Sequence, residues 1–111
     1  MCVDDDRAAA VAIRRNAEAC GFAERVEIRR ELVEGALGRL PRATFALAFL
    51  DPPYALGPEM ALPGLAPVLA PGGLAMAEHD ARRPPASRYG ALALADRREY
   101  GDTGISIYRL E

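Results

Sequence analysis

The sequence predicts an α/β fold with a mainly parallel sheet that closes in an antiparallel hairpin, and three features support this prediction. The apolar run Phe45–Leu50 lies between Pro41-Arg42 and a double proline, and its lack of polar alternation is typical of a strand buried on both faces of a parallel sheet. Segments with helical and with strand periodicity alternate along the chain. Two strand-like segments near the C-terminus flank Gly101-Asp102, which is a turn signal.

The first helix is predicted to begin after Asp6 and to end at Gly21. Asp6 suits the N-cap position because its carboxylate can accept from the free N–H groups of the first turn. The acidic cluster Asp4-Asp5-Asp6 also complements the positive end of the helix dipole, and glycine commonly ends helices. The apolar face is formed by residues at helical spacing, namely Ala9, Ile13, Ala17 and Cys20.

The remaining elements follow from shorter signals. Arg25–Arg29 alternates like a strand, and the apolar stripe from Leu32 to Leu40 predicts a second helix that ends at Pro41. Further prolines restrict the next helical segments to short turns at Glu59–Leu62 and Leu65–Leu69. The last predicted elements are a turn at Pro71–Gly73, a strand at Leu74–Glu78, a loop at Arg82–Pro85, and a hairpin of Leu92–Arg98 with Gly104–Arg109.

Composition predicts one small cytoplasmic domain covering residues 1–111. Half of the residues are hydrophobic, yet no apolar stretch is long enough to cross a membrane, and the acidic N-terminus does not resemble a signal peptide. Cys2 and Cys20 are too few for a disulfide framework or a metal site, so we expect reduced thiols and no bound metal. The formal charge of −2 does not by itself indicate a nucleic-acid-binding protein.

The stretch Asp51-Pro52-Pro53-Tyr54 directly follows the apolar strand and is the candidate catalytic site. Ligands of open α/β sheets bind at the carboxyl ends of the strands. The prolines stiffen the loop and keep the Pro52 carbonyl out of a helical turn, so Asp51 and this carbonyl form a pair of acceptors for one amino group. Tyr54 adds a flat face on which a base can stack. This arrangement could direct the lone pair of an amine at an electrophile.

These residues resemble the [DN]-P-P-[YF] motif of S-adenosylmethionine-dependent amino-methyltransferases. Together with Leu69–Leu74, Glu78-His79-Asp80 and Arg97–Thr103, they resemble the RsmD family, which methylates a guanine N2 in 16S ribosomal RNA. The resemblance covers essentially the whole chain. It implies a Rossmann-like class I methyltransferase sheet, with Asp51, Pro52, Pro53 and Tyr54 as the catalytic motif.

The resemblance also implies a cofactor site for S-adenosylmethionine. Asp4 stands where the family carries the acidic residue that binds the ribose hydroxyls, with Asp5 beside it, although Asp5 also suits a solvated helix start. Glu31 substitutes for the acidic residue that the family often has near the adenine of the cofactor. Asp51 is the last of the residues implied to bind the cofactor. The family's first strand and glycine-rich loop have no counterpart, so the chain resembles an N-terminally truncated methyltransferase domain. A dimer or a missing N-terminal segment would complete such a sheet.

The implied partner is 16S rRNA or the small ribosomal subunit. Tyr54, Arg82 and Arg83 are the candidate substrate-binding residues. Arg82, Arg83 and Arg88 are expected in the loop after the strand Leu74–Glu78, on the same edge as Asp51. Arginines in such a loop would contact phosphates without reading sequence, although a solvated surface loop explains them equally well. A lone histidine such as His79 is more often a solvated or capped residue than a catalyst.

Two other functions remain open at this point. DNA adenine or cytosine amino-methyltransferases share the motif Asp51–Tyr54. Alternatively, the lack of a glycine-rich loop fits a non-catalytic remnant that binds no cofactor or that works only with another chain. Activity on ribosomal RNA, activity on DNA, and binding of the cofactor product would distinguish the three.

Overall fold

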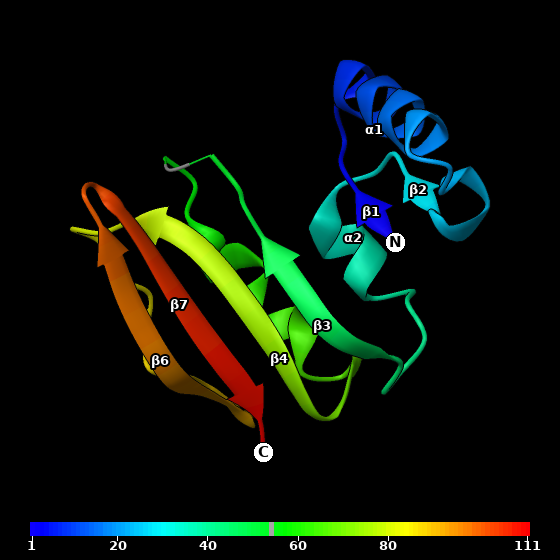
Figure 1. Cartoon of the computed structure of the whole chain (residues 1–111). Coiled ribbons are helices and arrows are strands. Elements are labelled where there is room, and N and C mark those ends of the chain that lie inside the picture. Colours follow the sequence, from blue (N-terminus) through cyan, green and yellow to red (C-terminus); the bar gives the residue numbers. More distant parts are fainter. Residues whose placement is uncertain (54) are drawn as a thin grey trace. The chain divides into compact units, whose positions relative to one another are not determined.

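The computed structural model describes residues 1–53 and 55–111. The chain divides into two compact units, Met1–Arg39 and Leu40–Glu111, and each is described by itself. The first unit contains β1 (Cys2–Val3), α1 (Arg7–Ala19), a 3-10 turn η1 (Ala23–Arg25), β2 (Ile28–Arg29) and α2 (Val33–Leu37). The second contains β3 (Phe45–Leu50), η2 (Pro58–Met60), α3 (Leu62–Leu65), β4 (Leu69–Asp80), β5 (Arg88–Tyr89), β6 (Leu92–Tyr100) and β7 (Thr103–Leu110) (Figure 1).

Helix α1 has the caps that its sequence predicts. The Asp6 carboxylate accepts a hydrogen bond from the Ala9 N–H at 2.9 Å, and Gly21 has a φ of 75° just beyond the helix. Ala17 is buried on the expected apolar face. Local sequence therefore determines both ends of this helix.

The first unit also contains a short parallel pair of strands. Cys2 pairs with Ile28 and Val3 with Arg29. The predicted strand Arg25–Arg29 is wrong at its start, because Arg25 belongs to η1 and the pairing with β1 extends over only two residues. Helix α2 is likewise shorter than the predicted stripe from Leu32 to Leu40, since it runs from Val33 to Leu37.

The second unit is a five-stranded sheet in the order β3-β4-β7-β6-β5. Strands β3 and β4 are parallel, whereas β4, β7, β6 and β5 are antiparallel neighbours. This pairing confirms the α/β class and the C-terminal hairpin. The tight turn of the hairpin uses Gly101 at a φ of 63°, followed by Asp102 at negative φ, as in a two-residue type II′ turn.

Strand β4 contains an irregularity where the sequence predicts a separate turn. Phe45 pairs with Leu69 and Leu47 with Leu74, so one residue of β3 between these pairs faces four residues of β4. A Cβ on Gly73 would lie 2.8 Å from the Ala70 carbonyl oxygen and 3.2 Å from that of Phe45. Pro71–Gly73 therefore bulges out of a continuous strand, because glycine lets the backbone pass close to β3.

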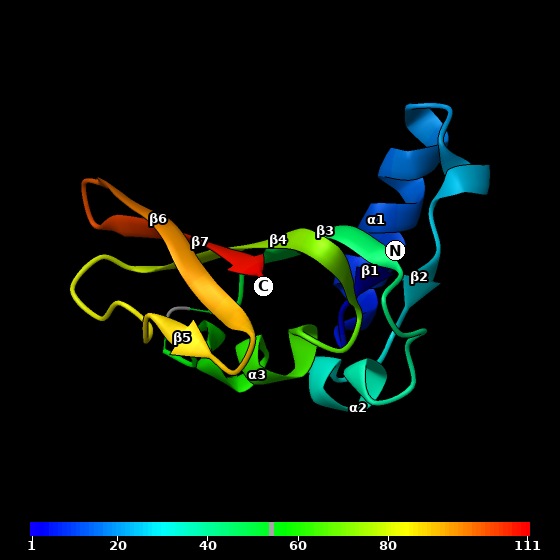
Figure 2. The same cartoon turned by 90° about the horizontal axis from the view of Figure 1, so that it is seen from below.

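One face of this sheet is covered by η2 and α3 (Figure 2). Facing residues of neighbouring strands are buried there, including Ala75 opposite Tyr108 and Ala77 opposite Ser106. Leu62 and Leu65 of α3 are buried as well. The Tyr108 hydroxyl donates to the Ala86 carbonyl at 2.6 Å, which satisfies its polar end inside the core. The predicted helical turn Leu65–Leu69 is wrong at its end, since Leu69 already begins β4, although the Val68 N–H donates to the Leu65 carbonyl at 3.0 Å.

The prediction that Phe45–Leu50 is buried on both faces is also wrong. Leu47 is 47% exposed and Phe49 is 67% exposed, because they lie on the face opposite to α3 and because β3 is an edge strand of this sheet. Ala48 and Leu50, which point to the covered face, are half-buried. Among the described residues, no helix is both long enough and apolar enough to span a membrane.

Candidate active site

The candidate site lies where the parallel strands β3 and β4 carry acidic residues at their carboxyl ends. Leu50 pairs with Ala77, so Asp51 and Glu78 are the next neighbours in this register. Side chains alternate between the faces of a sheet. Asp51 and Glu78 therefore both point to the face that η2 and α3 leave uncovered, the face of Leu47 and Phe49.

The two carboxyl groups are hydrogen-bonded to each other, which raises the pKa of Glu78 above its ordinary value of 4.5. The hydrogen bond with Asp51 is the main cause, and the negative charge of Asp51 adds to it. A nearby like charge disfavours the ionised form of a carboxylic acid. Asp51 is exposed and Glu78 is half-buried, so both groups can meet a ligand from solution.

In the loop after Asp51, the carbonyl groups of Pro52 and Pro53 differ in their hydrogen bonds. The Pro53 carbonyl accepts from the N–H groups of Leu56 at 2.9 Å and Gly57 at 3.1 Å, which closes the loop into a turn. Within the described residues, the Pro52 carbonyl accepts no backbone hydrogen bond. The Pro52 carbonyl is therefore open to another donor, and its pairing with Asp51 around one amine stays a prediction. Tyr54 lies outside the described residues, so its stacking role stays a prediction.

A small pocket of about 160 Å³ lies next to this turn. It is lined by Ala55–Glu59 of the loop and the start of η2, and by His79, Asp80 and Arg83 at the end of β4 and just after it. Arg83, one of the two arginines predicted to bind substrate, therefore lines this pocket.

His79 is buried and hydrogen-bonded at both ring nitrogens, so the expectation of a solvated residue is wrong. Its Nδ1 lies 2.8 Å from the Asp80 carbonyl oxygen and its Nε2 lies 2.8 Å from Ser106 Oγ. A carbonyl can only accept, so Nδ1 carries the proton and Nε2 accepts from the Ser106 hydroxyl. Ser106 Oγ in turn accepts from Arg97 Nε at 2.8 Å. Gly104 makes room for the ring, since a Cβ there would lie 2.3 Å from His79 Cε1.

The three arginines considered for RNA binding differ in position. Arg82 donates to both carboxylate oxygens of Asp80, at 3.2 and 3.1 Å, and this guanidinium lowers the pKa of Asp80. Its side chain is still 79% exposed, and Arg83 next to it is exposed. Both therefore lie near the end of β4 that carries Glu78.

The expectation that Arg88 shares this edge is wrong. Arg88 lies in β5 opposite Ala93, whose other partner is Arg109. Arg109 pairs with Leu74, so Arg88 is level with the beginning of the Leu74–Asp80 part of β4 rather than with its end. Its guanidinium also forms an ion pair with Glu111 at 3.1 Å.

The predicted cofactor residues of the first unit lie together after β1 and β2. The Glu31 N–H donates to the Asp4 carbonyl at 3.1 Å. Asp4 Oδ1 accepts from the Asp6 N–H at 2.9 Å, and Oδ2 has no hydrogen bond within the part of the chain that the structure describes. Asp5 is exposed, as expected for a solvated helix start. The Glu31 carboxylate forms an ion pair with Arg39.

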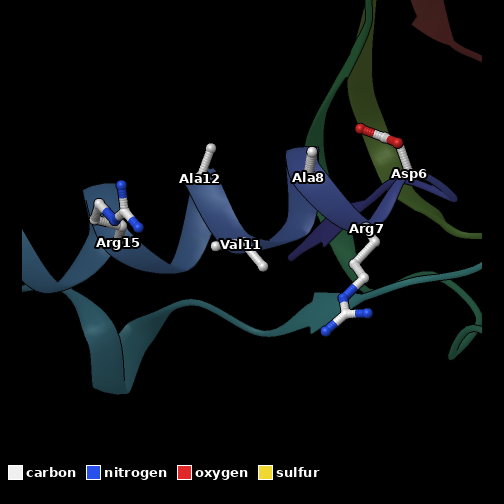
Figure 3. Close-up of a pocket in the computed structure, with 6 residues that line it drawn as sticks. All are labelled: Asp6, Arg7, Ala8, Val11, Ala12 and Arg15. Carbon is white, nitrogen blue, oxygen red and sulfur yellow. The ribbon is translucent and has the colours of Figure 1, made fainter.

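A second, wide depression of about 520 Å³ lies along α1 and contains no predicted site residue. Figure 3 shows its lining, which comes entirely from the start and one side of this helix: Asp6, Arg7, Ala8, Val11, Ala12 and Arg15. Within the described ranges 1–53 and 55–111, no three His, Cys, Asp or Glu residues are grouped as a metal site would need.

Glu78 is the site residue to which sequence reasoning assigned no role. The available signal was that Glu78 ends a predicted strand on the same edge as Asp51. Only the register of β3 against β4 shows that the two carboxyl groups are direct neighbours.

Comparison with known proteins identifies both a family and a fold. The model of a family described as Conserved hypothetical protein 95 matches residues 1–109. No curated protein matches the chain. A solved structure of a conserved hypothetical protein from Streptococcus pyogenes has a TM-score of 0.87 and 25% identity, with 98% of this chain and 69% of that chain covered.

Two further solved structures connect the fold to methyltransferases. The protein yhhF from Escherichia coli, provisionally named a methyltransferase, has a TM-score of 0.83 at 19% identity and covers 98% of this chain and 62% of its own. A methyltransferase from Geobacter sulfurreducens has a TM-score of 0.66 at 20% identity, covering 98% of this chain and 57% of its own. The chain therefore has a methyltransferase fold and spans 57% to 69% of the length of these three structures.

Proposed function

Since this chain belongs to the Conserved hypothetical protein 95 family and has a methyltransferase fold, we propose that it methylates the exocyclic N2 amine of a guanine in 16S ribosomal RNA. The methyl donor is S-adenosylmethionine. The resemblance to the RsmD family, which rests on Asp51–Tyr54 together with Arg97–Thr103, supports this choice of substrate.

The observation that carries the proposal is the pair of acceptors directly after β3. The exposed Asp51 carboxylate and the Pro52 carbonyl, which accepts no described backbone hydrogen bond, stand at the carboxyl end of a strand in an α/β sheet. Ligands bind at this edge in such folds. Two acceptors can hold the two hydrogens of one amine, which fixes the direction of its lone pair.

Asp51 then performs two tasks in the reaction. The lone pair of an amine attached to a purine is delocalised into the ring, and hydrogen bonds to Asp51 and Pro52 localise it on nitrogen. The cofactor supplies an electrophilic methyl group, so a carbon–nitrogen bond forms as the carbon–sulfur bond breaks. The nitrogen must lose one proton, and the Asp51 carboxylate is positioned to accept it.

The carboxylates of the first unit suit the hydroxyl groups of the cofactor, because they accept hydrogen bonds. Asp4 keeps one carboxylate oxygen without a hydrogen bond in the described residues, and a carboxylate can accept from two neighbouring hydroxyls. Glu31 is already paired with Arg39, so binding through Glu31 would have to compete with this ion pair. Asp4 is therefore the residue of this unit that we expect to hold the ribose.

The test is the Asp51→Asn variant with small ribosomal subunits or 16S rRNA as substrate. We expect at least a 100-fold loss of methyl transfer, because positioned proton acceptors contribute about 10²–10⁴-fold. Affinity for S-adenosylhomocysteine, measured by calorimetry, should change little. Asp102→Asn in the hairpin turn is the matched control. Turnover of Asp51→Asn at the wild-type rate would refute the proposal. Methyl transfer to DNA adenine or cytosine in place of rRNA would refute the assignment of rRNA guanine as the substrate.

A further inference from the structure

The role of Glu78 follows from the chemistry of the bases that carry an exocyclic amine. In guanine, the N2 amine stands beside N1–H, so two donors are adjacent. In adenine the ring atom beside the N6 amine is an acceptor, and in cytosine the atom beside the N4 amine is an acceptor too. A second acceptor next to the amine site therefore favours guanine, whereas a second donor favours adenine or cytosine.

Glu78 places such a second acceptor directly beside Asp51. The register of β3 and β4 makes the two residues neighbours, both side chains point to the same face, and their carboxyl groups are within hydrogen-bond reach of each other. Pro52 lies on the chain beyond Asp51, on the loop side. Glu78 and Pro52 thus both adjoin Asp51, Glu78 across the sheet and Pro52 along the chain.

We propose that Glu78 selects guanine by accepting the N1–H, while Asp51 and the Pro52 carbonyl hold the N2 amine. This inference rests on the proposed function, since it assumes that Asp51 binds an exocyclic amine. A guanine gives each carboxylate its own N–H, which relieves the repulsion between the two groups. Adenine or cytosine would instead place a ring lone pair against the Glu78 carboxylate.

Binding of short single-stranded oligoribonucleotides that differ only in the central base tests this directly. The three probes carry guanine, 2-aminopurine or hypoxanthine. 2-Aminopurine keeps the amine but has an acceptor at N1, whereas hypoxanthine keeps N1–H but lacks the amine. Affinities are measured by competition in fluorescence anisotropy, with S-adenosylhomocysteine present.

The wild-type chain should bind the guanine probe about 10-fold or more tightly than the 2-aminopurine probe, as expected for one hydrogen bond to a charged group. Glu78→Gln should lose most of this preference, because an amide can turn either a donor or an acceptor towards N1. The matched control is Glu111→Gln at the opposite end of the sheet. It removes a carboxylate whose ion pair with Arg88 is more than half exposed and should keep the preference.

The outcomes separate this inference from the proposed function. A wild-type chain that does not distinguish guanine from 2-aminopurine, or a Glu78→Gln variant that keeps the wild-type preference, overturns the role of Glu78. If Asp51→Asn leaves the preference for guanine over hypoxanthine unchanged, the amine site itself is wrong. If none of the probes binds, both proposals fail for this chain.

Discussion

Asp51 and Glu78 are two acidic side chains that lie directly beside each other and interact. The negative charge of Asp51 disfavours the ionisation of Glu78, and Arg82 forms its ion pair with Asp80. Pairs of interacting titratable groups with shifted pKa values are common at functional sites. The pair therefore supports the position of the site independently of the motif.

Glu78→Gln should accordingly stabilise the folded chain at neutral pH. The pKa of Glu78 is raised in the folded state, so the folded state binds more protons than the unfolded state between the two pKa values. Stability thus falls as pH rises from about 4.5 through the raised pKa. Glutamine does not ionise, so the Glu78→Gln variant does not lose stability in this pH range. Its Tm should therefore exceed that of the wild type at pH 7, and the difference should vanish below pH 4.5. Thermal scans across this range measure it, and a lower Tm for the variant at pH 7 contradicts the pairing.

Ser106 connects His79 to Arg97 in a buried network, and its loss should be costly. Ser106→Ala removes the partner of His79 Nε2 and of Arg97 Nε, both at 2.8 Å. Leaving buried polar groups unpaired costs about 1–3 kcal/mol of unfolding free energy. Denaturant unfolding measures this loss. Ser87→Ala, at an exposed position, is the control and should stay within about 0.5 kcal/mol; equal stability of both variants would contradict the network.

At the scale of elements, the hairpin of β6 and β7 depends on its turn. Gly101→Ala should destabilise the chain by about 1–2 kcal/mol, because a φ of 63° disfavours any residue with a Cβ. Beyond the adjoining residues of the chain, no atom lies within 4 Å of the place that this Cβ would occupy, so the cost comes from the backbone alone. Gly38→Ala, at an ordinary φ of −69°, should show no such loss in denaturant unfolding. A neutral Gly101→Ala variant would exclude the type II′ turn.

Strand β3 shows how an element can match its predicted boundaries and still differ in environment. It begins and ends at Phe45 and Leu50, as expected. Its side chains Leu47 and Phe49 are nevertheless exposed, because none of the described strands pairs with its second edge in this sheet. Exposed apolar edge strands favour association with other chains.

At the scale of the whole molecule, this exposed strand should make the chain self-associate. Phe49→Lys should reduce concentration-dependent association in sedimentation velocity, since a lysine on an edge strand opposes pairing with another chain. Because Phe49 is 67% exposed, the free energy of unfolding should change by no more than about 0.5 kcal/mol. Wild-type chain that remains monomeric at high concentration would contradict this prediction.

The sequence alone determined the features that depend on neighbouring residues. The ends of α1 follow from Asp6 and Gly21, the hairpin turn from Gly101, and the position of Asp51 after an apolar strand from the run before it. Caps, turns and stiff proline loops involve only a few consecutive residues. These features were therefore predictable, as was the family resemblance that rests on the motif.

Only the tertiary structure decided which distant residues meet. The neighbours Asp51 and Glu78, the burial of His79 against Ser106, and the position of Arg88 all follow from strand register. A shift of one residue in register would turn each side chain to the other face of the sheet. Register depends on pairing between segments far apart in the chain, and so does the exposure of Phe49. That is why local patterns predicted the candidate motif Asp51–Tyr54 but not the second carboxylate beside it.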